Sequence, residues 1–334
     1  MYYKDLLRYR NVWLGVALLW IILFHLPETF NLGKLNFIKS FGYGGVDICL
    51  FASGIGCFYS LSSDSDILRF MKRRLKRLVP TYIIFIVGWL ICKCFIGHFD
   101  LQMALGNFLA VQNFTGNGND FNWYISAILL FYILAPYFKS IAERASNVKK
   151  VLFLVFLFVF SIPFWNSNTY IITVTRLPIF YMGMLFADIC KKDLKIRFSH
   201  IIGLVAACII GWLSLFLFSK FFSNYLWGYG LYWYPFIFIT PPLCIAVSCV
   251  FMIIEKCRFT KPISDFLSLC GDYSFELYLI HIPLVSLIPR VIDHFNLIKA
   301  GYAVWLAGGV VLLIGCFVLR RLATWISGLT VKRH

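Results

Sequence analysis

The chain has 334 residues, of which 60% are hydrophobic and only 14% are charged, and its mean hydropathy is +0.80. Soluble domains usually carry about 25% charged residues, so this composition excludes an ordinary soluble protein and indicates one embedded in a bilayer. The formal net charge of +16 does not indicate nucleic-acid binding, because the cations lie in short blocks between hydrophobic runs.

Hydrophobic runs recur along the whole chain and predict an all-α, polytopic membrane bundle of about ten helices. The first run follows Lys4, Arg8 and Arg10, but no cleavage site of small residues comes after it, so we expect a retained span rather than a signal peptide. No repeat or soluble segment interrupts the pattern, and residues 1–334 are expected to form a single domain. The predicted spans lie near residues 12–27, 41–60, 79–97, 122–139, 150–164, 171–190, 199–219, 235–255, 272–289 and 302–325.

The positions of Lys and Arg predict the orientation of these spans. With both termini inside, the inner segments collect most of the 31 Lys and Arg, as the positive-inside rule requires. A multi-pass protein of the cell membrane, of the bacterial plasma-membrane type, is therefore expected. The outer loops retain only Lys34, Lys39, Lys220, Arg290 and Lys299.

Ionisable side chains within the spans are candidates for function, because burying a charge in a bilayer is costly. The predicted topology brings His25, Asp47, Arg176 and His281 to a similar outer depth on four different helices, and puts Glu276 near the middle of its helix. Each has a purely structural alternative: an interfacial histidine, a helix cap, a snorkelling arginine, or a histidine bonded to a carbonyl that the following proline frees. Glu276 needs a partner from another helix.

Two further patterns have alternative interpretations. Small residues recur in "GYGGVDICLFASGIGCF" (42–58), which indicates close helix packing, room for an elongated ligand, or both. In "RFMKRRLKRLVPTY" (69–82), apolar residues form a stripe opposite the cations, which predicts an amphipathic helix lying at the inner interface against anionic lipid.

The eleven cysteines indicate neither a disulfide framework nor a metal site. Most lie within hydrophobic segments, where free cysteine behaves as a small buried hydrophobe. The closely spaced pair Cys92 and Cys94 lacks the spacing and the second pair of a structural zinc site, so no metal is expected.

Five segments in chain order together resemble the acyltransferase family 3 of integral membrane proteins. The resemblance covers nearly the whole chain and corresponds to its short, single-domain branch. One position departs from the family pattern: Leu14 stands where the family usually has an arginine, eleven residues before its histidine, and Arg10 lies one helical turn earlier. The segments are "GGVDICLFASG" (44–54), "RRLKRLVPTY" (73–82), "NWYISAILLFYILAPYF" (122–138), "RLPIFYMGMLFA" (176–187) and "YSFELYLIHIPL" (273–284).

This resemblance implies transfer of an acyl group, most often acetyl, from cytoplasmic acyl-coenzyme A to a hydroxyl of a surface or exported glycan. Acyl-coenzyme A would be a co-substrate, no cofactor would be tightly bound, and the acceptor would be a glycan or a lipid-linked sugar. His25 matches the proposed catalytic histidine, with Asp47 expected to orient it. Direct transfer and a covalent acyl-histidine both remain open. Candidates for acceptor binding or for the oxyanion are Arg176, Trp123, Tyr124, Asn122, His281 and Glu276.

The same resemblance suggests where the donor binds. Coenzyme A carries several phosphates, and guanidinium groups bind phosphate bidentately. Arg74 and Arg77 are neighbours on a helix, Arg73 lies beside them, and Ser53 lies on the predicted path outward. A non-enzymatic glycan transporter is the main alternative and would not need these arginines; a membrane acyltransferase of another fold fits the arginine–proline segment less well.

Overall fold

The computed structural model describes residues 1–27, 30, 33–95, 99–115, 123–167, 169–256, 259–297 and 301–328, and every regular element in these ranges is a helix. Ten of the described helical segments are long and apolar enough to cross a membrane, which confirms the predicted polytopic bundle. They contain α2 (Arg10–His25), α4 (Gly45–Ser63), α5 (Ile67–Phe95), α8 (Trp123–Arg144), α9 (Asn147–Phe160), α11 (Leu177–Lys191), α12 (Phe198–Phe221), α13 (Phe236–Ile254), α15 (Ser274–His294) and α16 (Gly301–Ser327).

Shorter helices connect the spans. Among them, α10 directly precedes α11, and α6 and α7 follow one another between α5 and α8. The α-helical ones are α1 (Tyr3–Leu6), α3 (Asn36–Ser40), α6 (Leu101–Phe108), α7 (Gln112–Thr115), α10 (Ile171–Val174) and α14 (Lys261–Asp272), and 3₁₀ turns cover Leu7–Tyr9, Gly33–Leu35, Gly42–Gly44, Ile162–Phe164 and Ser223–Tyr225.

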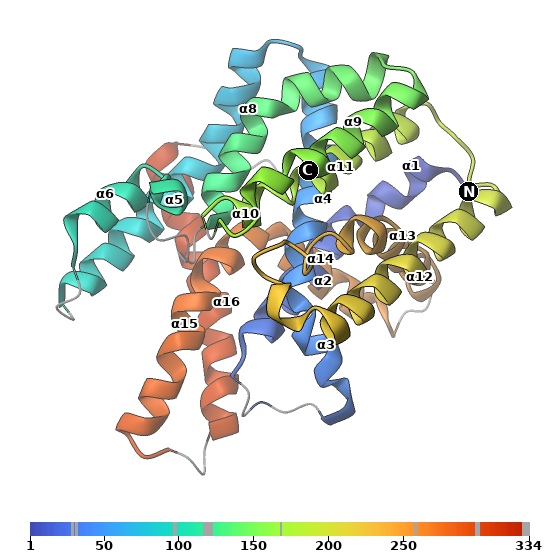
Figure 1. The fold of residues 1–334 in the computed structure, drawn as a ribbon. Coiled ribbons are helices and arrows are strands. Elements are labelled where there is room, and N and C mark those ends of the chain that lie inside the picture. Colours follow the sequence, from blue (N-terminus) through green and yellow to red (C-terminus); the bar gives the residue numbers. More distant parts are fainter. Residues whose placement is uncertain are drawn as a thin grey trace.

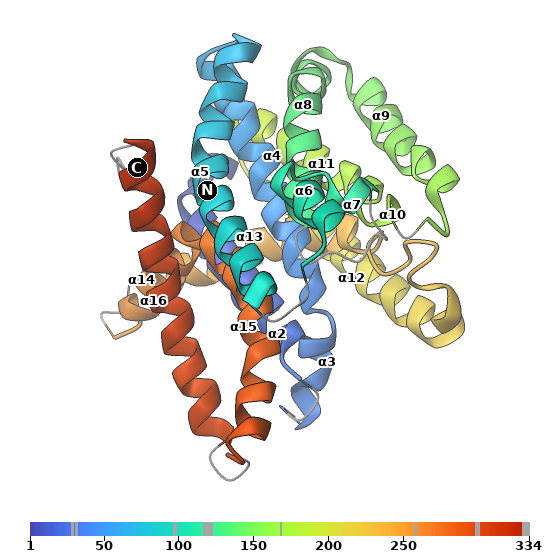
Figure 2. The same ribbon diagram turned by 90° about the vertical axis from the view of Figure 1, so that its left-hand side faces the viewer.

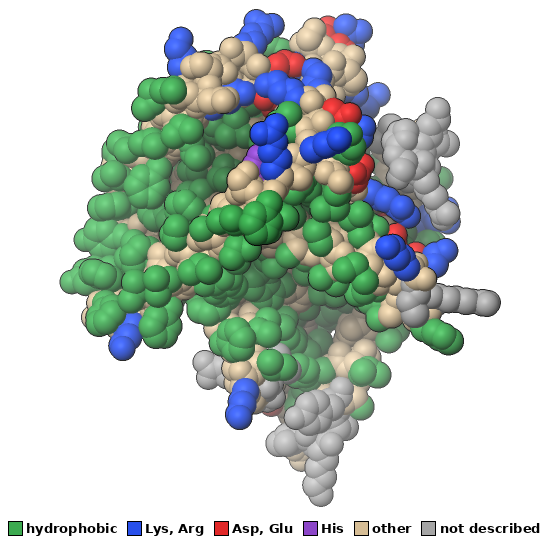
Figure 3. All heavy atoms as spheres, turned by 90° about the vertical axis from the view of Figure 1, so that its right-hand side faces the viewer, with side chains coloured by type: hydrophobic (Ala, Val, Ile, Leu, Met, Phe, Trp, Pro, Cys, Tyr) green, Lys and Arg blue, Asp and Glu red, His purple; other side chains and the backbone are tan. Residues whose placement is uncertain are grey.

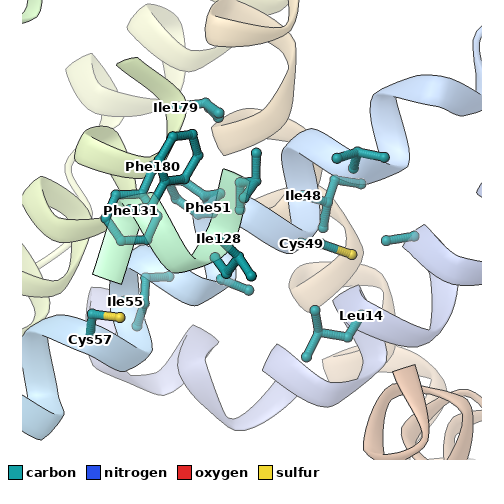
Figure 4. Close-up of a cluster of buried hydrophobic side chains, with 14 of the residues drawn as sticks. Leu14, Ile48, Cys49, Phe51, Ile55, Cys57, Ile128, Phe131, Ile179 and Phe180 are labelled. Carbon is teal, nitrogen blue, oxygen red and sulfur yellow. The ribbon is translucent and has the colours of Figure 1, made fainter. Parts of the chain in front are cut away.

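Helix α4 is the central helix of the bundle and is buried along most of its length (Figures 1 and 2). It packs against α2 on one side and α11 on another, and Figure 4 shows part of the apolar core between α4, α8 and α11, where the Phe131 and Phe180 rings lie 5.2 Å apart. Helices α15 and α16 run side by side next to α5. By contrast, α12 is largely exposed, as expected of a helix whose partner is lipid.

Charged side chains gather at one end of the molecule, beside a broad hydrophobic belt (Figure 3). Ion pairs tie the helix ends together there: Lys150 and Lys192 both contact Asp188, at 2.9 and 2.7 Å, and Lys191 contacts Glu143 at 2.7 Å. This charged end contains the segments that the sequence assigns to the inner side of the membrane.

The basic segment before Pro80 differs from the prediction. It is not a separate helix lying at the interface, because α5 is one continuous helix from Ile67 to Phe95 with Pro80 inside it. A proline removes one backbone hydrogen bond, but membrane helices tolerate this where neighbouring groups compensate. The cations therefore occupy the inner end of a transmembrane helix.

A twelve-residue helix, α14, was not predicted as a separate element. It crosses α2 closely, since a Cβ atom at Gly15 would lie 1.9 Å from the Leu267 carbonyl oxygen and one at Gly271 would lie 1.9 Å from that of Asn11. Only Tyr273 separates α14 from α15, so this crossing sets where α15 begins within the bundle.

Candidate active site

A partly open cavity lies between α2, α4, α5, α8 and the start of α15. At its inner end it is lined by Arg10, Arg74 and Arg77. Its outer lining includes Ile21, Val46, Cys49, Tyr124 and Tyr278, with Ser53 in between. On α4 the lining residues repeat every three or four positions, so one face of this helix forms a wall of the cavity.

Two of the three arginines donate to backbone carbonyls of α4. Arg10 donates from Nε to the Ala52 oxygen (3.2 Å), and Arg74 donates from Nη2 to the Gly56 oxygen (2.5 Å). A Cβ atom at Gly56 would lie 3.3 Å from an Arg10 nitrogen, so glycine leaves room for both side chains. In the described part of the chain none of the three forms an ion pair, which leaves a concentration of positive charge facing the cavity.

Arg73 has different surroundings from Arg74. It donates from Nη1 to Asp64 Oδ2 (2.7 Å) and from Nη2 to the Ser60 carbonyl (3.3 Å), outside the cavity lining. The hydrogen bond from Arg73 lowers the pKa of the Asp64 carboxyl below its usual range. The structure thus groups Arg74 and Arg77 but places Arg73 in a surface ion pair.

Arg10 was not among the predicted site residues. Its spacing of four residues from Leu14 nevertheless indicates that it lies on the same face of α2. Both residues line the cavity. Arg10 therefore brings a guanidinium group to the same wall at which the family pattern has an arginine in place of Leu14.

His25 and His281 are neighbours at the outer side, with ring centroids 5.1 Å apart. His25 Nδ1 lies 2.9 Å from the Ile21 carbonyl oxygen, and His281 Nδ1 lies 2.7 Å from that of Tyr278. A carbonyl oxygen only accepts, so each Nδ1 carries the hydrogen and each neutral ring keeps the Nε2 lone pair. His281 is fully buried and its Nε2 has no partner among the described residues.

The cavity leads toward this histidine pair. Ile21 and Tyr278, whose carbonyl oxygens hold the two rings, both line it. Along α2, Arg10 and His25 are fifteen residues apart, which corresponds to about 22 Å at 1.5 Å per residue. The cavity therefore runs from the inner arginines toward the outer histidines, although neither histidine is among its lining residues.

Asp47 and Arg176 form a second buried group. Arg176, 1% exposed, precedes α11, and its Nε lies 3.8 Å from Asp47 Oδ1. The rings of Trp123 and Trp233 enclose its guanidinium group, each with its centroid 4.8 Å away, and Nη1 donates to the Ile172 carbonyl (2.8 Å). Asp47 Oδ2 has no hydrogen-bond partner in the described chain. Asp47 thus contacts Arg176, whereas His25 donates its orienting hydrogen bond to the Ile21 carbonyl.

The remaining predicted residues are dispersed. Tyr124 and Ser53 line the cavity, and the Tyr124 ring lies 4.9 Å from that of Tyr278. Asn122 lies outside the described residues. Glu276 is in the first turn of α15 rather than near the helix centre, because the helix begins at Ser274.

The partner that Glu276 required comes from α16. Arg320 donates from Nε to Oε1 (2.9 Å) and from Nη2 to Oε2 (2.6 Å) of this carboxylate. Its guanidinium group also lies 3.7 Å from the centroid of the Tyr273 ring. This bidentate pair joins α15 to α16, and Glu276 is not among the residues that line the cavity.

Comparison with known proteins identifies one family. The family described as an acyltransferase domain matches residues 11–321, nearly the whole chain, and the acyltransferase family 3 resemblance is thereby confirmed. No curated protein and no solved structure matched the chain.

Proposed function

Because the chain belongs to this family of membrane acyltransferases, we propose that it transfers an acyl group, most simply acetyl, from cytoplasmic acyl-coenzyme A to a hydroxyl of a surface or exported glycan. The observation that carries this proposal is a cavity lined at its inner end by three arginines that form no ion pair in the described part of the chain, and at its outer end by Ile21 and Tyr278, whose carbonyl oxygens bond the histidine pair. Such a path suits a long donor with an anionic head and a reactive thioester at its other end.

In this proposal the phosphates of the donor bind Arg10, Arg74 and Arg77 at the inner end. Guanidinium groups are suited to this task because they stay charged and present paired donors to phosphate oxygens. The pantetheine arm then extends along the α4 wall past Ser53 toward Tyr124. Small side chains on this wall leave a passage for a narrow ligand.

His25 is the proposed general base. Its Nδ1–H is bound to a carbonyl, so Nε2 can accept the proton of the acceptor hydroxyl as its oxygen attacks the thioester carbon. The C–S bond then breaks, and the proton passes from His25 to the departing thiolate. The acyl-transfer oxyanion needs donors nearby. We propose Arg176 and Tyr124 for this role, with Asp47 holding Arg176 in place.

The test is replacement of His25 by alanine. A general base typically contributes about 10²–10⁴-fold to the rate, so His25→Ala should lower acyl transfer by at least about 100-fold, with unchanged membrane insertion. Acyl ester content of the surface glycan, in cells carrying equal amounts of each protein, measures this. The matched control is His294→Ala, which removes a histidine that is the last residue of α15 and should leave transfer unchanged because His294 does not line the cavity. Normal acylation by the His25 variant would refute the proposal.

A glycan transporter is the second candidate. The buried polar groups at the outer side are compatible with sugar binding, but a transporter gives no reason for three arginines at the inner end of the cavity that form no ion pair with any described residue. Charge reversal at Arg74 and Arg77 separates the two: a transporter that still inserts should tolerate it, whereas an acyl-coenzyme A enzyme should lose donor binding.

A further inference from the structure

His281 on α15 carries a buried acceptor atom that the proposed acyl transfer does not use. The residue is fully buried, and its Nδ1 lies 2.7 Å from the Tyr278 carbonyl oxygen and 3.0 Å from that of Leu277. Both carbonyls only accept, so the hydrogen of the neutral ring is on Nδ1. Nε2 keeps its lone pair, and no described residue donates to it. A buried acceptor without a donor costs free energy, so Nε2 is suited to a donor that a ligand or a water molecule supplies.

The neighbouring histidine cannot supply this donor. The rings of His25 and His281 lie 5.1 Å apart and meet at 69°. His25 also uses its Nδ1–H on a carbonyl, that of Ile21, so its Nε2 is a second acceptor. Two acceptors cannot hydrogen-bond one another, and each needs an O–H or N–H group of its own. The histidine pair therefore fits a ligand that presents two donors side by side.

A sugar with hydroxyls on two adjacent carbons is such a ligand. Each hydroxyl has one O–H to donate, so a single hydroxyl can serve only one of the two rings. The proposed reaction brings one acceptor hydroxyl to Nε2 of His25, and a hydroxyl on the next carbon then lies beside it, on the side of a neighbouring ring. A water molecule also offers two donors, and the experiment has to separate it from the sugar.

We propose that His281 is a specificity-determining residue, whose Nε2 accepts a hydrogen bond from a second hydroxyl of the acceptor, adjacent to the hydroxyl that is acylated. This inference rests on the proposed function, and it narrows the acceptor class to sugars with a vicinal diol. A site built to bond a substrate hydroxyl rejects an analogue that lacks it, because the buried polar group is then left unpaired. His281 thereby selects the sugar and fixes which of its two hydroxyls faces His25.

The position of the ester in the product is the first test. Surface glycan from cells with and without this chain is compared by NMR, which assigns the acylated carbon. We expect the ester on a carbon whose neighbour carries a free hydroxyl. An ester on a hydroxyl without such a neighbour would overturn the role of His281 while leaving acyl transfer intact. If no ester depends on the chain, the proposed function fails, and this inference fails with it.

The second test is His281→Phe, which keeps a ring of similar size but removes the acceptor. Ester content per amount of inserted protein should fall about tenfold or more, because a hydroxyl of the acceptor then meets an apolar ring. The remaining ester should be divided between the two hydroxyls of the diol, since nothing fixes which one faces His25. A bridging water, or a purely structural role, instead predicts a loss with no change of position, and that result would overturn the proposal.

His281→Gln decides the outcome if His281→Phe forms no ester or does not insert. The glutamine side chain has an oxygen that can accept in place of Nε2. Ester at the original position in this variant would support the proposal, and its absence from an inserted protein would overturn it.

A matched control and a donor measurement complete the experiment. His294→Phe makes the same change at an exposed residue of the same helix and should alter neither the amount nor the position of the ester. Because His281 does not line the arginine cavity, His281→Phe should leave the dissociation constant of coenzyme A within about twofold, measured on the full chain in nanodiscs. A rise as large as the loss of ester would assign His281 to the donor and overturn the proposal.

Discussion

Arg73 and Arg74 are adjacent in the chain but differ in what neutralises them. Arg73 is paired with Asp64, whereas Arg74 bonds a carbonyl and lies over the rings of Phe70 and Tyr132, with centroids 5.4 and 5.5 Å away. An exposed ion pair contributes little to stability, and its loss leaves the cavity unchanged. This contrast provides an internal control for donor binding.

We predict that Arg74→Gln and Arg10→Gln each raise the KM for acyl-coenzyme A at least about tenfold, because each removes a charged hydrogen bond to phosphate. Arg73→Gln makes the same chemical change one residue away and should leave KM within about twofold. Initial rates at varied donor concentration measure both. Equal effects at Arg73 and Arg74 would mean that the net charge of the helix end, rather than the cavity, governs donor binding.

Some of the site was predictable at the level of single residues. A polar side chain inside a hydrophobic span is conspicuous in the sequence, and the span boundaries give its depth. His25 and His281 could therefore be expected at a similar depth in the membrane. Contacts between helices could not be read in this way. The pairing of Asp47 with Arg176, and of Glu276 with Arg320, depends on which helices are neighbours and how each is rotated.

At the scale of helices, the glycines in α4 and α11 determine how closely these two helices approach. A Cβ atom at Gly54 would lie 2.1 Å from the Phe180 carbonyl oxygen, and one at Gly183 would lie 2.1 Å from that of Phe51. The backbones therefore meet at both positions. The small residues predicted to allow close packing do so at Gly54, while Ser53 beside it lines the cavity on another face of the helix. Passage of an elongated ligand along that face stays a prediction.

We predict that Gly54→Ala and Gly183→Ala each lower stability, by about 1–3 kcal/mol, because the added methyl group meets backbone atoms that cannot move away easily. The thermal midpoint of the purified protein in detergent measures the change. Gly88→Ala is the matched control: it lies within α5 and its added methyl would meet nothing within 4 Å. A Gly54→Ala protein as stable as the Gly88→Ala protein would show that the crossing is looser than described.

Continuity between helices was harder to predict than their existence. The apolar stretch after Pro80 identified a span, but the charged stretch before it resembles an interfacial helix when considered alone. Tertiary contacts determine which of the two structures forms. Phe70 is fully buried and Arg74 donates to a carbonyl of α4, so the charged stretch is anchored in the bundle and continues the span inward. Helix α14 was missed for a related reason, because it is too short and too polar to appear as a span.

At the scale of the whole molecule, the proposed reaction requires a fixed orientation across the membrane. The arginines must face the compartment that contains acyl-coenzyme A, and the histidine pair must face the acceptor. The arginines line the cavity, and the histidine pair lies beyond Ile21 and Tyr278 of the cavity lining, so inverting the protein would turn the arginines away from the cytoplasm. The distribution of Lys and Arg over the loops is what selects the orientation with the arginines inside.

We predict that a cysteine at Lys34 reacts with a membrane-impermeant maleimide in intact cells, whereas a cysteine at Lys149 reacts only after the membrane is permeabilised. Both positions are exposed, and they lie on opposite sides of the bundle in the predicted orientation. Cys92 and Cys94, which are exposed, should first be replaced by serine to remove background labelling. The reverse pattern would place the arginines away from cytoplasmic coenzyme A. The donor would then have to bind from the other compartment, and acyl transfer from cytoplasmic acyl-coenzyme A would be excluded for this chain.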